Sequence, residues 1–410
     1  MQHNTRLNPA GPVTQERSST AAVFLVFLRL GLTSFGGPVA HLGYFRDEFV
    51  TRRQWVSESD YAELVALCQF LPGPASSQVG MALGLLRAGL WGAVAAWAGF
   101  TLPSAVALVL FALGLAGSDH AAAVTALHGL KVVAVAVLAQ ALWGMARQLC
   151  KSVLHISIMA VATCVVLWLP SAWGQVGALA GAGLAGLVWC QAQPEARHQP
   201  LPGGVSPRSG LVWLSLFAAL LLGLPLCQAL WPGSTLALVD AFFRAGSLVF
   251  GGGHVVLPLL QAEVVPPGWV DQDIFLAGYA AAQAVPGPLF TFAAFLGASM
   301  TGPPSGWLGG LIGLLAIFAP SFLLIVGVLP FWHGLRRHAR MQAALSGIQA
   351  AVVGLLLAAL YQPVWTSAIH QPKDFGLALV GFVALMFWRL PPWLVVLGCG
   401  LAGWAMQAAL

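Results

Sequence analysis

Two arginines at equivalent positions in the two halves of the chain are well suited to binding an anion. Arg29 lies seven residues before Gly36, and Arg244 lies seven residues before Gly251. A guanidinium donates forked hydrogen bonds to a tetrahedral dianion, and an unpaired cation in an apolar segment is costly. We therefore predict that both arginines are counter-charges of an anion site. The competing interpretation is that each side chain extends to the lipid headgroups as a topology anchor.

Interrupted helices supply a second kind of anion-binding group, the free backbone N–H. The motifs QFLPGP (69–74) and QAVPGP (283–288) lie in apolar segments, where proline and glycine end a helix. A helix that starts after such a break presents its first N–H groups and the positive end of its dipole. The predicted binding groups near the breaks are Gly36, Gly37, Gly251, Gly252, Gln69, Gln283, Ser76 and Ser77. The residues predicted to make the breaks are Pro38, Pro72, Gly73, Pro74, Gly253, Pro286, Gly287 and Pro288.

Two further pairs match between the halves and have two interpretations each. Gln69 and Gln283 precede their breaks by three residues, so their amides are candidates either to bind an oxyanion or to cap freed carbonyls. Glu48 and Glu263 align when the two halves are superimposed in sequence, and they are candidates for a proton relay. Both glutamates adjoin polar loops, so the simpler interpretation is an exposed role at the membrane interface.

Other charged residues have local interpretations. Lys131 is matched by Gln349 and is expected to extend its ammonium group to the membrane surface. Asp60 and Asp273 are expected to be helix N-caps.

The elements that must position these groups are transmembrane helices. Of 410 residues, 59% are hydrophobic and 8% are charged, against roughly 25% charged in soluble domains. The 47 glycines and 26 prolines indicate close helix packing and interrupted helices. The six cysteines and ten histidines have no metal-ligand spacing, and no cofactor, phosphate-loop or hydrolase motif occurs. We therefore predict an all-α integral membrane protein that is not an enzyme and has no metal or cofactor.

An internal repeat organises the chain. FLRLGLTSFGGP (27–38) aligns with FFRAGSLVFGGG (242–253), and QFLPGP aligns with QAVPGP in the same order. We predict a polar N-terminal tail (1–20), a first repeat (21–190), a linker with one transmembrane helix (191–238) and a second repeat (239–410). An even number of crossings per repeat and one linker helix would invert the second repeat.

The distribution of basic residues favours this inversion. With a cytoplasmic N-terminus, most basic residues of the loops fall on the cytoplasmic side. They are Arg46, Arg52, Arg53, Arg87, Arg147, Lys151, Arg197, Arg208, Arg336, Arg337, Arg340 and Arg389. The outer loops 266–273 and 301–306 contain no Lys or Arg, and Lys373 is the one loop exception. We predict nine full crossings, four broken or re-entrant segments and a periplasmic C-terminus. The choice between a hairpin and a broken span at each break stays open.

The two pairs of motifs resemble those of the chromate ion transporter family in its two-domain, long-chain form. The resemblance rests on FLRLGLTSFGGPVAHLGYFRDEFV with QFLPGPASSQVGMALG, and on FRAGSLVFGGGHVVLPLL with QAVPGPLFTFAAFLG. It covers both repeats and implies a protein of the bacterial inner membrane that exports chromate and confers chromate resistance. One departure is Gly253 where the first half has Pro38, so the two breaks are expected to differ in flexibility.

The residues leave the substrate open. Chromate and sulfate are tetrahedral dianions of similar shape, and no residue separates them. An intramembrane enzyme acting on a lipid phosphate would also use arginines and helix N-termini, and it is the alternative from another class. As partners we expect an oxyanion and membrane lipid, and no nucleic acid. Self-association stays open.

Overall fold

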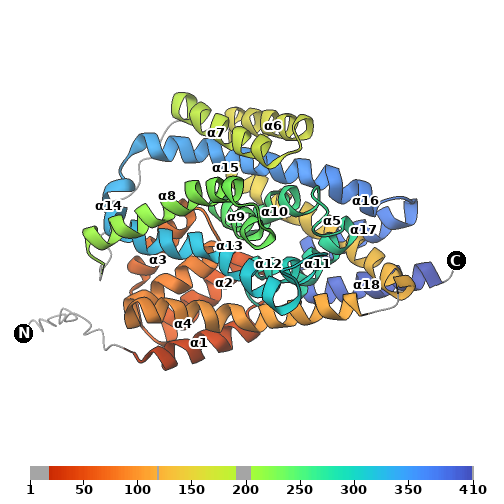
Figure 1. The fold of residues 1–410 in the computed structure, drawn as a ribbon, viewed down its shortest axis with the longest axis horizontal. Coiled ribbons are helices and arrows are strands. Elements are labelled where there is room, and N and C mark those ends of the chain that lie inside the picture. Colours follow the sequence, from red (N-terminus) through yellow and green to blue (C-terminus); the bar gives the residue numbers. More distant parts are fainter. Residues whose placement is uncertain (1–17, 118–119, 191–204, 409–410) are drawn as a thin grey trace, which may run out of the picture.

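Each predicted break separates two helices in the computed structural model, which describes residues 18–117, 120–190 and 205–408 (Figure 1). The helices of the first half are α1 (Thr20–Thr33), α2 (Gly37–Arg46), α3 (Glu58–Phe70), α4 (Ala75–Ala116), α5 (His120–Leu149), α6 (Val153–Trp168) and α7 (Ala172–Trp189). The linker helix is α8 (Pro207–Leu230). The remaining helices are α9 (Ser234–Leu248), α10 (Val256–Val264), α11 (Gln272–Ala284), α12 (Phe292–Ala298), α13 (Gly306–Val328), α14 (Trp332–Leu335), α15 (Ala339–Ala359), α16 (Thr366–Ala368), α17 (Pro372–Met386) and α18 (Pro392–Ala408).

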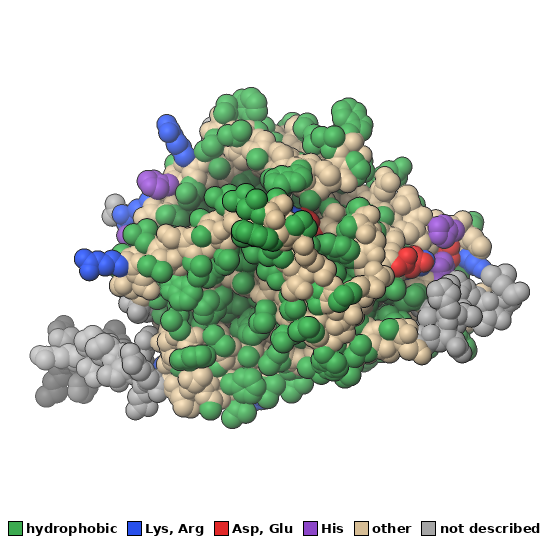
Figure 2. All heavy atoms as spheres, viewed as in Figure 1, with side chains coloured by type: hydrophobic (Ala, Val, Ile, Leu, Met, Phe, Trp, Pro, Cys, Tyr) green, Lys and Arg blue, Asp and Glu red, His purple; other side chains and the backbone are tan. Residues whose placement is uncertain are grey.

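The surface is that of an integral membrane protein. Five helices within the described ranges are long and apolar enough to cross a membrane: Ala75–Ala116, Leu127–Leu149, Pro207–Leu230, Gly306–Leu335 and Ala339–Ala368. Hydrophobic side chains cover the broad middle of the face in Figure 2, whereas the visible Lys and Arg side chains lie mostly at its left end. In Figure 1 most long helices run between the two ends. The linker helix α8 has only Gly210 buried, which suits a helix surrounded by lipid.

The N-cap prediction for Asp60 and Asp273 is wrong. The Ser57 hydroxyl accepts a hydrogen bond from the Asp60 backbone N–H at 3.1 Å, and the Asp271 carboxylate accepts one from the Asp273 N–H at 2.8 Å. In both places an earlier residue is the cap, because the helix starts before the predicted aspartate.

The two halves exchange helices. α5 of the first half packs against α17 and α18 of the second, and α15 of the second half packs against α6 and α7 of the first. Glycines allow this close approach: a Cβ at Gly129 would lie 2.6 Å from the Cys399 carbonyl oxygen, and one at Gly347 would lie 2.2 Å from that of Ala182. Gly129 and Gly347 align within the matching segments LHGLKVV and LSGIQAA, so equivalent glycines make equivalent contacts.

Two reciprocal hydrogen bonds join the breaks of one half to those of the other. The Gly73 N–H donates to the Val249 carbonyl oxygen at 2.7 Å, and the Gly287 N–H donates to that of Ser34 at 2.9 Å. Both donors are the glycines of Pro-Gly-Pro motifs, and each acceptor lies two residues before a glycine-rich break. The Pro-Gly-Pro break of each half is therefore bonded to the glycine-rich break of the other half.

A second set of glycines makes a testable packing prediction. A Cβ at Gly297 in α12 would lie 2.1 Å from the Gly309 carbonyl oxygen of α13, and that neighbour is backbone. We expect Gly297→Ala to destabilise the folded protein by about 3 kcal/mol, because neither helix can yield without losing its packing. Thermal unfolding of the purified protein in detergent measures the effect. Gly43→Ala is the matched control, since nothing lies within 4 Å of its added Cβ, and equal unfolding of the two variants would contradict the prediction.

Candidate functional site

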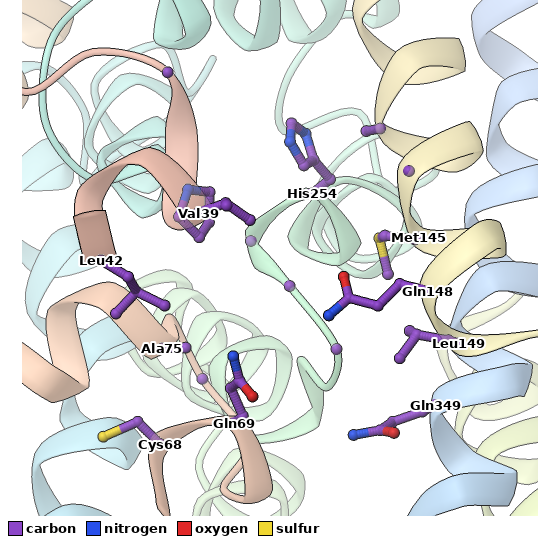
Figure 3. Close-up of a pocket in the computed structure, with 18 of the residues that line it drawn as sticks. Val39, Leu42, Cys68, Gln69, Ala75, Met145, Gln148, Leu149, His254 and Gln349 are labelled. Carbon is purple, nitrogen blue, oxygen red and sulfur yellow. The ribbon is translucent and has the colours of Figure 1, made fainter. Parts of the chain in front are cut away.

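A cavity of about 330 Å³ lies where the breaks of the two halves meet (Figure 3). It is enclosed by α2, α3 and the start of α4 from the first half, the 251–254 segment of the second half, and the long helices α5 and α15. The lining residues are Gly36, Pro38, Val39, Leu42, Cys68, Gln69, Leu71, Gly73, Ala75, Gln140, Ala141, Gly144, Met145, Gln148, Leu149, Gly251, Gly252, Gly253, His254 and Gln349. None of these residues is Lys, Arg, Asp or Glu, so the cavity is polar without a fixed charge.

Three glutamine amides point into the middle of the cavity. Figure 3 shows Gln148 from α5 and Gln349 from α15 extending from the right, and Gln69 from α3 extending from below. Their amide groups have no hydrogen-bond partner among the described residues. Each amide can therefore donate two hydrogen bonds to a bound ligand.

Two glycine-rich breaks add backbone groups to the same cavity. Gly36 (φ +99°) and Gly37 (φ +77°) reverse the chain before α2, whose first turn has no side-chain cap. Its free N–H groups and dipole form an anion-attracting end. The matching break has Gly251 (φ +77°) and Gly252 (φ +149°), but there a short 3₁₀ turn precedes α10. The two breaks therefore differ in how the next helix starts, with Gly253 beginning the 3₁₀ turn.

His254 lines the cavity, and two side chains of α11 lie within hydrogen-bonding distance of its ring. Its Nδ1 lies 2.8 Å from the Tyr279 hydroxyl and 3.5 Å from the Gln283 amide nitrogen. When Nδ1 accepts from Tyr279, the ring proton is on Nε2, which makes that nitrogen a donor. Val39 occupies the position of His254 in the first half, so the two faces of the site differ. Gln283 contacts His254 and does not line the cavity, unlike Gln69.

The serines beyond the first Pro-Gly-Pro break are buried behind the cavity. Ser76 Oγ lies 3.4 Å from His41 Nδ1, and His41 Nε2 lies 3.2 Å from the Ser34 carbonyl oxygen. The Ser77 hydroxyl has no hydrogen-bond partner within the described part of the chain. Neither Ser76 nor Ser77 lines the cavity.

The carbonyl-capping role considered for Gln69 belongs to another residue, Gln78. Its Nε2 donates to the Pro72 carbonyl oxygen at 2.7 Å. This bond satisfies a carbonyl that the Pro-Gly-Pro break frees from the helix. The sequence signal that could have identified Gln78 is its position in the first turn after the break.

Arg29 and Arg244 lie outside the cavity lining. Arg244 donates to Glu263 through Nε at 3.0 Å and Nη2 at 2.8 Å, and to Asp240 through Nη1 at 2.8 Å. These two carboxylates accept three hydrogen bonds from the guanidinium, one from each of its nitrogens. Arg29 is exposed on α1. In this conformation, therefore, neither guanidinium forms part of the cavity wall.

The two matched glutamates have different partners. Glu263 binds Arg244, whereas Glu48 binds Arg52 at 2.8 Å and Arg53 at 2.7 Å. Glu263 joins α10 to α9, whereas the two partners of Glu48 follow it closely in the chain. Neither glutamate lines the cavity. Across the described part of the chain, no three His, Cys, Asp or Glu side chains gather in a way that could hold a metal ion.

Sequence comparisons place this architecture among transport proteins. A family model described as chromate transporter matches residues 21–187 and 236–404. A chromate transport protein of Pseudomonas aeruginosa is 28% identical over 406 residues, covering 93% of this chain and 91% of that protein. A probable chromate transport protein of Synechococcus elongatus is 29% identical, covering 92% of this chain and 93% of that protein. A chromate transport protein of Cupriavidus metallidurans is 29% identical, with 92% and 91% covered. No solved structure matches the chain.

Proposed function

Because the chain belongs to the chromate transporter family, we propose that it exports chromate across the bacterial inner membrane by alternating access at the cavity between the breaks, and so confers chromate resistance. The family consists of multi-pass transport proteins, not enzymes, so the lipid-phosphate enzyme is set aside. The two matched segments, 21–187 and 236–404, correspond closely to the proposed repeats 21–190 and 239–410.

The cavity chemistry is the observation that supports this proposal. A tetrahedral dianion has four oxygens, and the cavity offers the amides of Gln69, Gln148 and Gln349 with the N-terminal end of α2. Hydrogen bonds to a charged acceptor are about twice as strong as neutral ones. In the present conformation these neutral donors would hold the anion without a fixed counter-charge.

The symmetry of the breaks supports alternating access. The paired bonds of Gly73 to Val249 and of Gly287 to Ser34 join the halves at equivalent points. We propose that the repeats have inverted topology, with a cytoplasmic N-terminus and a periplasmic C-terminus, and that they rock about these two bonds. Under this topology the present cavity, which lies near the Leu149 end of α5, is open to the cytoplasm.

The membrane potential favours export. Two negative charges leaving a cell that is negative inside gain about 4.6 kcal/mol per 100 mV, twice the value for one charge. A coupled proton is therefore unnecessary in energetic terms. We assign Arg244 to holding α9 against α10 through Glu263, while Asp240 on its own helix orients the guanidinium. A counter-charge role would require Arg244 to leave these partners during transport.

Uptake into inside-out membrane vesicles tests the proposed function. We expect vesicles containing the protein to accumulate chromate when the interior is positive, because that polarity drives a dianion inward. Adding sulfate outside the vesicles at increasing concentrations measures how strongly it inhibits chromate uptake. Strong inhibition would indicate a general oxyanion transporter, and weak inhibition a transporter selective for chromate. Vesicles with Gln342→Ala are the control, since Gln342 donates to the Arg336 carbonyl oxygen away from the cavity. Chromate uptake no faster than in vesicles lacking the protein would overturn the proposal.

A further inference from the structure

Lys131 forms a partly buried ion pair that joins α5 of the first half to α11 of the second. Its Nζ lies 2.8 Å from Asp273 Oδ2, and the side chains are 11% and 44% exposed. The two helices pack against each other at this place. A lysine in an apolar helix needs a counter-charge, and Asp273 supplies it, so the ammonium group does not extend to the headgroups as expected from the sequence.

The equivalent helices of the other half are separated by the cavity. Gln349 of α15 occupies the position of Lys131 in the second repeat, and α3 is the equivalent of α11 because both lead into a Pro-Gly-Pro break. Gln349 and Gln69 line the cavity from α15 and α3. The helices α5 and α11 are thus in contact and joined by an ion pair, which we call the closed pair. The equivalent helices α15 and α3 stand apart and present amides to the cavity between them, which we call the open pair.

We propose that Lys131 is an oxyanion ligand of the opposite-facing state, in which it exchanges Asp273 for the transported anion. The inference rests on the proposed function, because it requires α11 to leave α5 as α3 approaches α15. Lys131 would then line the outer cavity at the position that Gln349 holds in the present one. The exchange keeps the buried cation paired in both states, and the half-exposed Asp273 returns to water when it is released.

A tetrahedral dianion is a suitable competitor for this lysine. It offers two negative charges where Asp273 offers one, and the ammonium group donates up to three hydrogen bonds. An ammonium is a compact charge with rotatable donors, so it can follow the anion through a change of position. Arrival of the anion would therefore favour separation of α11 from α5.

Cysteine accessibility tests the role of the ion pair. In a protein with its six native cysteines replaced, Gln69→Cys reports on the present cavity, and Ala282→Cys, now 4% exposed, reports on the opposite one. We expect Asp273→Asn to raise labelling of Ala282→Cys by a membrane-impermeant maleimide about tenfold and to lower that of Gln69→Cys. Arg46→Gln is the control, because Arg46 and Glu58 form an exposed ion pair on the surface. Unchanged labelling of both reporters in Asp273→Asn would overturn the proposal.

A charge exchange separates a binding role of Lys131 from a purely structural one. Lys131→Asp combined with Asp273→Lys restores an ion pair, so it should restore the labelling pattern. We expect the chromate transport of this double variant to be at least about tenfold lower than that of the parent protein. The cation is then on α11, and no longer on α5 where the proposal requires it. Recovery of full transport would show that only the ion pair matters and would overturn the ligand role. Lys131→Arg, which keeps the charge, should retain most transport, and its complete loss would also contradict the assignment.

The two failures are distinguishable. If the parent protein moves neither chromate nor sulfate in vesicles, the proposed function fails whatever the labelling shows. If the parent transports chromate while Lys131→Gln transports it equally well, the further inference alone fails.

Discussion

Replacing Gly73 by alanine is expected to abolish chromate export. The added Cβ would lie 2.3 Å from Ser321 Oγ and 2.7 Å from Gln78 Nε2, and the backbone φ of +124° is one that alanine rarely adopts. Such strain typically costs about 1–3 kcal/mol, and overpacking adds a similar amount. Relief of this strain would move the Gly73 N–H away from the Val249 carbonyl oxygen and break one of the two bonds between the halves. We expect efflux from intact cells at normal expression to fall at least about a hundredfold.

Two comparisons define the cause of that loss. Gly144→Ala also changes a cavity glycine, but nothing lies within 4 Å of the new Cβ, so efflux should be unchanged. Combining Gly73→Ala with Ser321→Ala removes the shortest contact but keeps the positive φ, so partial recovery is expected. If Gly73→Ala keeps the unfolding temperature and the efflux of the parent protein, the hydrogen bond from Gly73 to Val249 is not essential to the fold or to transport.

Removing the three cavity amides together is expected to abolish oxyanion binding without unfolding the protein. A hydrogen bond to a charged group contributes about 1.5–3 kcal/mol, so each of Gln69→Ala, Gln148→Ala and Gln349→Ala should weaken chromate binding roughly tenfold or more. The triple variant should show no measurable transport. Its unfolding temperature should stay close to that of the parent, because none of the three amides bonds to another described residue. Transport at several chromate concentrations separates the loss of affinity from a loss of turnover.

The contrast with the arginines makes this prediction decisive. If the triple variant transports normally while Arg29→Gln or Arg244→Gln does not, the anion is bound by guanidinium groups in another conformation. Loss of transport in Arg244→Gln accompanied by a lower unfolding temperature would instead agree with the ion pairs to Asp240 and Glu263.

The proposed site is a cavity without Lys, Arg, Asp or Glu in its lining. A dianion attracted by helix ends and amides has to lose much of its hydration shell, and those dipoles replace it. Because both faces of the cavity come from breaks of opposite halves, a relative movement of the halves changes the donors around the anion. His254 with Tyr279 on one side and Val39 on the other makes the two faces chemically unequal.

The sequence by itself determined the helical membrane fold and the positions of the breaks. Pro72 and Gly73 act through their own backbone, since proline lacks an N–H and glycine adopts positive φ, so their effect on a helix can be predicted without knowing what surrounds them. The equivalence of the halves was equally visible, because it is a property of residue order. The inverted orientation of the second repeat relative to the first is a proposal that rests on the distribution of basic residues in the loops.

Only the tertiary structure decided which groups meet. Gln148 and Gln349 lie in uninterrupted helices, where nothing local marks one glutamine as facing a cavity. Arg244 looked like an anion ligand because an unpaired membrane cation is costly, but Glu263 of the next helix already pairs with it. Local conformation follows from each residue's own chemistry, whereas the partner of a side chain depends on how distant helices pack.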